Sequence, residues 1–395
     1  MKNLLVVFAL FFSVTLVYGE SPQKVYRITQ EYYTNDWYKK QSELWKKEIE
    51  KNPQNATAWE NYYYANRYAR FEDINSKERQ AKLARIIEEM GRAIPDSYEY
   101  TLLKAWNSHD VDDIPGYEKA YKMNPDRPDP LYNMITHYEL HNNVEKAKEL
   151  YHKLYKARDI MPPLLDYNYN VLMSLEEDAI LFTNGDNDTY PARMLQIVKN
   201  IRPDVTIINI SMGTTEKYLL RKLQEHNYSV NFKELTQKAN LEPDESSPEV
   251  KKNVLIALVS ELTNKYPDIK IYFALTVYDP FKEKFKSNLY ITGLAERYAS
   301  NPLDNVALLK KHIEQNFRLD DVILKWYGEE YVGATLMAQM NLNYIPAFLK
   351  LAEHYQIVGE TWRANQWANK ALVLAKNGGE DELIQFINSK GFHVD

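Results

Sequence analysis

Three short apolar runs, rich in β-branched residues, are the feature that most constrains the fold of this chain. They cover residues 179–183, 205–210 and 271–275 and are apolar at nearly every position. Strands that read as continuous apolar runs are buried on both faces, as in a parallel sheet. The intervening segments at 191–201 and 248–266 have apolar residues at helical spacing, which indicates βαβ units. We therefore expect residues 166–300 to form a small Rossmann-like α/β domain with a parallel sheet, with a further strand at 289–292.

The segments on either side of this domain have a helical period instead. Helices at about 130–141 and 143–157 fit the template of a tetratricopeptide repeat, and the C-terminal segment fits it better. The template positions are Leu131, Met134, Tyr138, Ala147, Tyr151 and Leu154 in the first pair and Phe348, Leu351, Ala352, Tyr355, Ala364 and Ala371 in the second. Two more helices, broken at Asn52-Pro53, are expected within 36–71. The sequence thus predicts tetratricopeptide-like helical segments at 20–165 and 301–395, flanking the α/β domain.

The first nineteen residues have the anatomy of a signal peptide. Lys2 precedes a run of apolar or small residues from Leu4 to Val17, which ends at Val17-Tyr18-Gly19. A bilayer span needs roughly 20 apolar residues, so cleavage after Gly19 is favoured over an uncleaved membrane anchor. Because no later apolar run approaches that length, we expect an exported, periplasmic or secreted protein with no membrane span after cleavage.

Cysteine usage and charge exclude several classes of function. The chain has no cysteine, which excludes disulfides, thiolate metal sites, cysteine nucleophiles and a lipid anchor on cysteine. The formal net charge is −6, and it becomes −7 when the signal peptide, which contains Lys2, is removed. No basic cluster offsets this charge, so a nucleic-acid partner is not expected.

Polar residues follow each of the three expected strands. Because the carboxyl ends of parallel strands meet at one edge of a sheet, where ligands of open α/β sheets bind, these residues form the candidate ligand site. They are Asn184, Asp186, Asp188, Ser211, Thr214 and Asp279. Helices starting near Pro191 and Thr215 would point their N-termini at the same place, which suits a polar or zwitterionic ligand or a sugar.

Two interpretations of the aspartates in this site stay open. Asp186 and Asp188 could bind a divalent cation through their carboxylate oxygens. Alternatively, Asp188 or Thr189 caps a helix that begins near Pro191, and Gly185 supplies an unusual backbone angle in the turn.

Four segments of the α/β region resemble a known family. They are Asp178–Pro191 with its Gly-Asp-Asn-Asp-Thr block, Ile201–Ser211, Ile271–Val277 and Gly293–Ala295. The stretch 175–300 is similar to the soluble C-terminal region of an uncharacterised Bacteroidota membrane-protein family related to protein O-mannosyltransferases. The resemblance implies a Gram-negative periplasmic setting and an accessory or recognition role near envelope glycan or the secretion machinery. The polytopic transferase part has no counterpart here, so glycosyl transfer is not implied, and Ala192-Arg193-Met194 departs from the family pattern.

Other chemical motifs are weak. No nucleophile elbow, HExxH helix, Walker loop or GxGxxG turn occurs. His137 and His141 are four residues apart and could share a metal, but no third ligand is apparent in the sequence, which favours a solvated helix face. Ser211 has no histidine or acid beside it and is best interpreted as a turn hydroxyl. The aromatic residues between Trp37 and Tyr64 fit packing between helices better than a sugar or peptide site.

Two classes of function survive. Stacked helical repeats favour a non-enzymatic binding or scaffold protein with a protein, peptide or glycan partner in the cell envelope. The alternative is a metal-assisted enzyme acting on sugar or phosphate, with Asp186 and Asp188 as ligands. The absence of an evident general base in the sequence favours the binding class.

Overall fold

The computed structural model describes residues 21–70, 76–108, 112–239, 247–324 and 332–394. The expected signal peptide lies outside these residues. The chain divides into two compact units, residues 1–25 with 34–94 and residues 26–33 with 95–395. Within the described residues, no helix combines the length and apolar character that crossing a bilayer requires.

The first unit contains three helices, α1 (Asn35–Lys51), α2 (Ala56–Tyr68) and α3 (Ser76–Ala93). The expected break at Asn52-Pro53 is confirmed, and the side chain of Asn55 accepts a hydrogen bond from the backbone N–H of Ala58 to begin α2. Trp59, Tyr63 and Tyr64 are buried. These aromatic side chains therefore pack the helices together, as their spacing predicts.

The second unit begins with five helices, of which the first four pack successively against one another. They are α4 (Tyr98–Asn107), α5 (Ile114–Met123), α6 (Asp129–Leu140), α7 (Val144–Ala157) and α8 (Pro162–Met173). The predicted helices at 130–141 and 143–157 correspond to α6 and α7, which pack against each other. Of their template residues, five are buried and Tyr138 is half-buried. The helical pairing is therefore confirmed.

Three parallel strands form the centre of the sheet. They are β1 (Ile180–Thr183), β2 (Thr206–Asn209) and β3 (Ile271–Ala274), and every residue in them is buried. The order is β2-β1-β3, with Ile180 opposite both Thr206 and Ile271. The three strands predicted from the apolar runs are confirmed to within one residue at each end.

The prediction of an entirely parallel sheet is wrong, because the sheet is mixed. β5 (Ala295–Tyr298) pairs antiparallel with β3, and β4 (Leu289–Ile291) pairs antiparallel with β5 at the edge. A tight turn joins β4 to β5, in which Thr292 N–H donates to Ala295 O and Gly293 has φ +148°. A glycine permits this backbone conformation, so the chain reverses within the sheet instead of crossing over.

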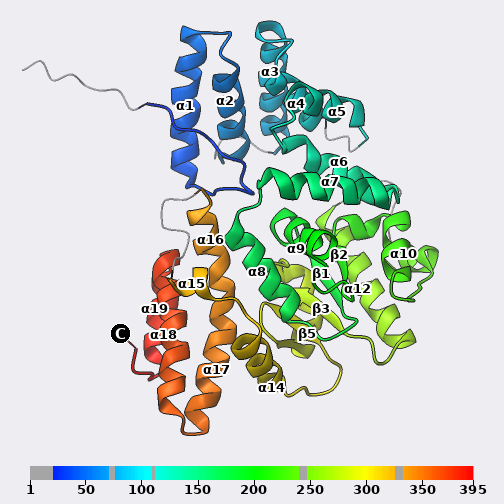
Figure 1. Cartoon of the computed structure of the whole chain (residues 1–395), viewed down its shortest axis with the longest axis vertical. Helices are drawn as coiled ribbons and strands as arrows, with labels where there is room; N and C mark the ends of the chain where they lie inside the picture. The colour runs from blue at the N-terminus through cyan, green and yellow to red at the C-terminus, as the bar shows by residue number, and fades with distance from the viewer. Residues whose placement is uncertain (1–20, 71–75, 109–111, 240–246, 325–331, 395) are drawn as a thin grey trace, which may run out of the picture. The chain divides into compact units, whose positions relative to one another are not determined.

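The connections between the parallel strands leave on opposite faces. α9 (Asp186–Lys199) leads from β1 to β2, and α12 (Pro248–Lys265) precedes β3 on the far side of β1. The chain moves across the sheet in one direction from β1 to β2 and in the other direction from β2 to β3. Because such crossovers are right-handed, the two helices lie on opposite faces of the sheet. In Figure 1, α8 lies to one side of the strands and α12 to the other.

Further short elements complete the second unit around this sheet. They are η1 (Met212–Thr214), α10 (Glu216–Gln224), α11 (Phe232–Lys238), α13 (Asp279–Lys282), η2 (Glu283–Asn288), α14 (Asn305–Leu309), the π-helical η3 (Lys310–Glu314), α15 (Asp320–Leu324), α16 (Ala334–Asn341) and η4 (Leu342–Tyr344).

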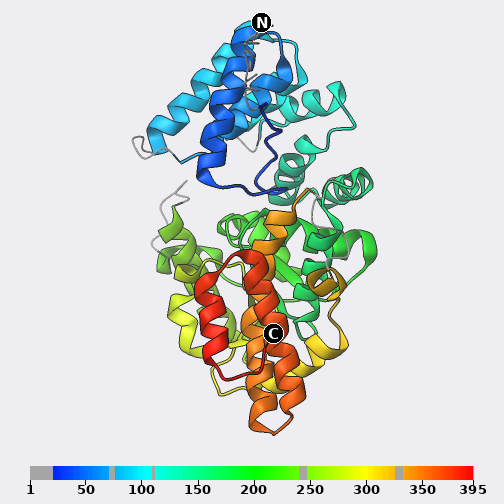
Figure 2. The same ribbon diagram turned by 90° about the vertical axis from the view of Figure 1, so that its left-hand side faces the viewer.

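The C-terminal helices are α17 (Ile345–Ile357), α18 (Thr361–Gly378) and α19 (Asp381–Ser389). They lie side by side, coloured orange to red in Figure 2. All six template residues predicted here, from Phe348 to Ala371, are buried. One apolar core extends from Tyr98 through the sheet to Phe392. The expected boundary at 165/166 falls inside α8, and the one at 300/301 lies between β5 and α14, so both stay predictions as domain boundaries.

Candidate functional site

The helix after β1 begins earlier than the sequence suggests. A start near Pro191 was expected, but α9 begins at Asp186 and contains Pro191. Proline lacks an N–H, so the carbonyl of Asn187 has no partner four residues on. The side-chain amide of Asn168 on α8 donates to this carbonyl at 2.8 Å. Asn168 thus replaces the missing helical hydrogen bond, and the helix continues through the proline.

Asp188 ties together the loops after β1 and β3. Its carboxylate accepts hydrogen bonds from the backbone N–H groups of Asn184 and Gly185, both at 2.8 Å, and from the hydroxyl of Thr276. The residue is buried, and burial raises the pKa of its carboxyl, which the bonds from Asn184, Thr276 and Gly185 oppose. Asp188 therefore caps the N-terminus of α9, in agreement with the capping interpretation. It does so as the third residue of the helix and not as the residue before it.

A second set of hydrogen bonds connects the loop after β2. The Thr189 hydroxyl lies 2.7 Å from that of Thr183 and accepts from the side-chain amide of Asn209 at 3.0 Å. The Asn209 side-chain oxygen accepts from the N–H groups of Ser211 and Met212. The three loops are thus joined at one edge of the sheet. We call this edge, formed by residues 184–189, 209–215 and 276–279, the carboxyl edge.

Asn184 and Asp186 lie at the surface of the carboxyl edge. Asp186 lines a small depression together with Tyr132, Asp159 and Pro191. The protein around this depression shields the Asp186 carboxyl from water, and this desolvation raises its pKa. The neighbouring carboxylate of Asp188 raises the pKa further. Asp186 is exposed, whereas Asp188 is buried, so the two aspartates have different environments.

The predicted residues after β2 and β3 are also accessible. Ser211 is exposed, and its carbonyl accepts a hydrogen bond from the Thr214 hydroxyl at 2.9 Å. Asp279 begins α13, is exposed, and lies 3.3 Å from the ammonium of Lys282. Beside it, Tyr278 is 62% exposed, which is unusual for so large an aromatic ring. Tyr278 is not among the site residues that the sequence predicts.

Four other residues that join the loops are also absent from the predicted site. Thr183, Thr189, Asn209 and Thr276 are each near the end of a strand or the start of a helix. A hydroxyl or amide directly after a buried strand is the signal that could have identified them. Their partners, up to 88 positions away in the chain, carry no such signal.

The carboxyl edge offers few ligands for a cation. Asp188 accepts at both carboxylate oxygens from protein donors, and its backbone N–H partners cannot move away without opening α9. Asp186 and Asp279 keep accessible carboxylates, and Asp279 lies 3.3 Å from the ammonium of Lys282. Hard cations such as Ca²⁺ or Mg²⁺ require several oxygen ligands, so this arrangement suits hydrogen bonding to a polar ligand better than metal binding.

A buried ionic cluster connects α9 with α6 and α10. The carboxylate of Glu139 on α6 accepts from Arg193 at 3.1 Å and from Arg221 of α10 at 2.6 Å. Glu139 is 4% exposed, and its arginine and lysine neighbours outweigh burial and lower its pKa to about 2. Arg193 belongs to the segment that departs from the family pattern. Its side chain binds Glu139 and thereby ties α9 to α6.

Comparisons with known proteins agree with part of the sequence analysis. The family model described as TMEM260-associated domain 2 matches residues 164–288, which is less than half of the chain and overlaps most of the stretch on which the family resemblance rests. No curated protein sequence matches. Among matching solved structures is "Crystal Structure of the Yeast Tom70", with 13% sequence identity and a TM-score of 0.26. The alignment covers 91% of this chain and 61% of that one.

Proposed function

We propose that this chain is an exported binding protein of the bacterial periplasm or cell surface, without catalytic activity of its own. Its helical hairpins bind a protein or peptide partner in the cell envelope, and its carboxyl edge binds a polar ligand such as a glycan on that partner.

The observation that carries this proposal is the path of the chain at β1 and β3. These strands are parallel neighbours, and the connections of the sheet leave on opposite faces. In Rossmann-like sheets, ligands bind beyond the carboxyl ends of the strands at such a switch point. Asp188 and Thr276 are hydrogen-bonded across this switch point, which fixes the two loops.

Four residues stay exposed around these loops, namely Asn184, Asp186, Tyr278 and Asp279. A fixed frame with exposed hydroxyl, amide, carboxylate and aromatic groups suits recognition of a sugar.

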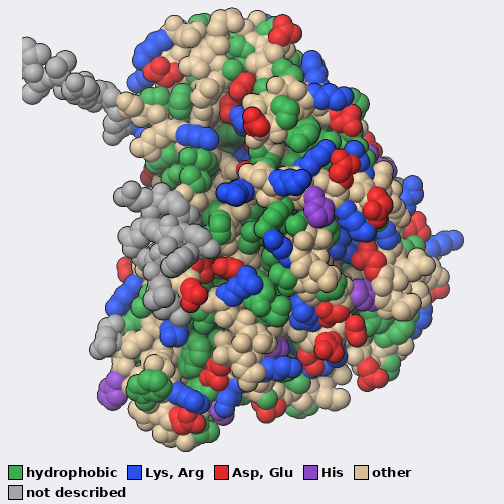
Figure 3. Space-filling view, in the orientation of Figure 1, with side chains coloured by type: hydrophobic (Ala, Val, Ile, Leu, Met, Phe, Trp, Pro, Cys, Tyr) green, Lys and Arg blue, Asp and Glu red, His purple; other side chains and the backbone are tan. Residues whose placement is uncertain are grey.

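The helical hairpins support the proposal that the partner is a protein. At the turn between α17 and α18, Ile357 is 84% exposed and Trp362 is 70% exposed, with Val358 between them also exposed. Apolar side chains gathered at a surface are typical of interaction sites. Elsewhere, on the face in Figure 3, basic and acidic side chains are interspersed, as on an ordinary protein surface.

The hydrogen bonds of Asp188 weigh against the metal-assisted enzyme. Such an enzyme needs both Asp186 and Asp188 as ligands, and Asp188 is occupied by protein donors on both oxygens. The buried hydroxyls of Thr183 and Thr189 are bonded to each other. Asp188 is therefore not available as the second ligand that the enzyme hypothesis requires.

Affinity capture from envelope extract tests the proposal. The immobilised chain should retain the same partner from repeated extracts, and prior enzymatic deglycosylation of the extract should reduce its retention. Trp362→Ala should weaken capture of the polypeptide, while Tyr278→Ala should remove the difference between intact and deglycosylated extract. Retention of no partner, or chemical conversion of a captured sugar or phosphate compound, would contradict a binding protein.

A further inference from the structure

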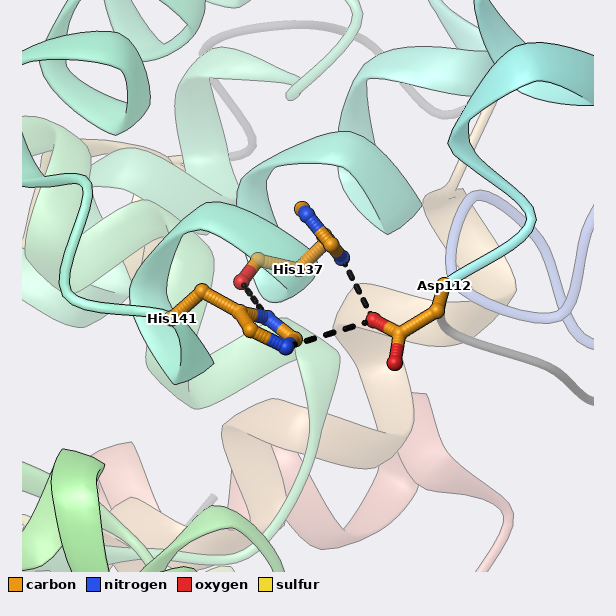
Figure 4. Close-up of side chains that lie close together, drawn as sticks. All are labelled: Asp112, His137 and His141. Atoms are coloured by element: carbon orange, nitrogen blue, oxygen red, sulfur yellow. Dashed lines mark hydrogen bonds and ion pairs between the residues drawn. The ribbon is translucent and has the colours of Figure 1, made fainter.

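Two histidines share one face at the end of α6. His137 and His141 are separated by one helical turn, so their side chains are neighbours on the helix surface. Their rings are stacked, with centroids 4.2 Å apart and an angle of 27° between the planes. Figure 4 shows both rings facing the same third side chain. The sequence pattern of two histidines thus becomes a local cluster in the fold.

The third side chain is Asp112, which the sequence did not reveal as a partner. It precedes α5 and lies 25 positions before His137 in the chain. Its Oδ1 is 2.7 Å from Nδ1 of His137 and 3.5 Å from Nε2 of His141. The three potential ligand atoms lie within 4.8 Å of one another. The packing of α5 against α6 therefore supplies the third ligand that two histidines on one helix lack.

The hydrogen bond of the second ring nitrogen fixes the tautomer of His141. Its Nδ1 lies 2.9 Å from the backbone carbonyl oxygen of His137. A carbonyl can only accept, so Nδ1 carries the proton, and in the neutral ring the lone pair is on Nε2. That lone pair faces the Asp112 carboxylate oxygen across 3.5 Å. Two acceptors in this arrangement repel each other unless a proton or a metal cation lies between them.

Two of the ligand separations in the cluster can be compared with those of a transition-metal site. Zn²⁺ lies about 2.0–2.2 Å from nitrogen and oxygen ligands, so tetrahedral ligands are about 3.3 Å apart. The separation of 3.5 Å between Asp112 and His141 fits this value, and the 2.7 Å contact with His137 must widen by about half an ångström. The Asp112 side chain is 55% exposed and can make this adjustment, whereas that of His137 is 18% exposed and stays anchored.

We propose that Asp112, His137 and His141 bind a divalent transition-metal ion of the Zn²⁺ type. Imidazole nitrogens select such ions over Ca²⁺ and Mg²⁺, which prefer oxygen ligands. The bond from His141 Nδ1 to a carbonyl is the outer contact that orients metal-binding imidazoles. Three protein ligands at the surface leave the fourth position to water or to a donor from a partner. The bound ion links the segment before α5 to the end of α6.

Titration of the metal-free full chain with Co²⁺ and Zn²⁺ tests this site. Wild-type protein should bind one ion and give the visible spectrum of Co²⁺ with nitrogen ligands, which Zn²⁺ abolishes by displacement. His137→Ala, His141→Ala and Asp112→Asn should each raise the dissociation constant by at least tenfold, because loss of a ligand costs no less than loss of an outer contact. His152→Ala removes an exposed histidine of α7 outside the cluster and should bind as the wild type does.

Circular dichroism verifies that each variant is folded, and His141→Gln serves as a second variant if His141→Ala is not. Binding that is absent from the wild type, or that is unchanged in a folded His141 variant, would overturn the proposal. The outcome is independent of the carboxyl edge, because Asp186→Ala should leave the metal titration unchanged.

Discussion

The hydroxyl of Thr276 donates a hydrogen bond to the carboxylate of Asp188, although the two residues are 88 positions apart in the chain. The bond spans the neighbouring parallel strands β1 and β3 at the point where the connections of the sheet change faces. It joins the loop after β3 to the first turn of α9. Asp188 therefore holds the loops after β1 and β3 together, while the exposed residues around it are available to a ligand.

Asp188→Ala should lower the free energy of unfolding by about 2 kcal/mol, because it removes a helix cap and leaves buried donors without an acceptor. Asp186→Ala, two residues away, should change it by less than about 0.5 kcal/mol, because the exposed side chain has no such bonds. Urea denaturation of both variants measures the difference. Equal losses in the two variants would show that Asp188 is not the residue that fixes the loops.

Glu139→Gln should destabilise the protein by about 3 kcal/mol at neutral pH, because it leaves Arg193 and Arg221 near a neutral group. The pKa of Glu139 is lowered to about 2 in the folded protein, below its ordinary value of 4.5. Its contribution is therefore complete above about pH 5 and is lost as the pH falls towards 2. The difference in unfolding free energy between wild type and variant should shrink over this range.

The exposed Glu145 on α7 provides the control for this prediction. Glu145→Gln should have little effect on stability at any pH, because solvent screens its pairing with Lys148. A wild-type advantage over Glu139→Gln that stays constant down to pH 2 would contradict the buried ionic cluster.

Asp321→Asn should increase stability by about 1 kcal/mol at pH 7.5, a value reduced for partial exposure to solvent. Burial, and secondly the nearby Asp166 carboxylate, raise the pKa of Asp321 to about 6. Because the folded pKa exceeds that of the unfolded chain, the stability contributed by Asp321 is present at low pH and is lost as the pH rises through 6. The gain of the variant should vanish near pH 4.

The exposed neighbour Asp320 is the matched control for this substitution, and Asp320→Asn should change stability little at either pH. Thermal unfolding of the three proteins at pH 4 and 7.5 measures the effect. A variant Asp321→Asn that is less stable than wild type at pH 7.5 would show that the ionised carboxylate is favoured at this position.

Gly293→Ala should cost 2 kcal/mol or more, on the order expected for overpacking combined with backbone strain. A side chain at this position, where φ is +148°, would collide with Ser174 and Phe317. At Gly359, where φ is +82°, a side chain would meet no atom within 4 Å. Gly359→Ala should therefore cost only about 1 kcal/mol from the backbone conformation. Similar losses in both variants would mean that the contact with Ser174 is unimportant.

The sequence predicts the parallel strands and the helical hairpins because their apolar residues are continuous or have a helical period. It does not predict β5, in which only Ala295 is fully buried and Glu296, Arg297 and Tyr298 are partly exposed. Without an apolar run, this strand has no signal in the sequence.

The start of α9 and the partners of the site residues are not predicted from the sequence for a different reason. Pro191 indicates a helix start locally, but Asn168, 19 positions away from Asn187, supplies the missing hydrogen bond. Thr276 and Asp112 likewise act on residues that only the folded chain brings near. Local patterns therefore predict the elements and the edge at which the candidate site lies, while the roles of individual side chains depend on tertiary contacts.

The affinity of the captured partner for Asp186→Ala tests the central proposal most directly. Asp268→Ala provides the matched control, because Asp268 is an exposed aspartate that precedes β3 and lies at the opposite edge of the sheet. Both variants should melt at the wild-type temperature. If the carboxyl edge is the binding site, Asp186→Ala should raise the dissociation constant at least about tenfold, the loss of a charged hydrogen bond, and Asp268→Ala should not change it. Wild-type affinity of Asp186→Ala for every captured partner would contradict the site.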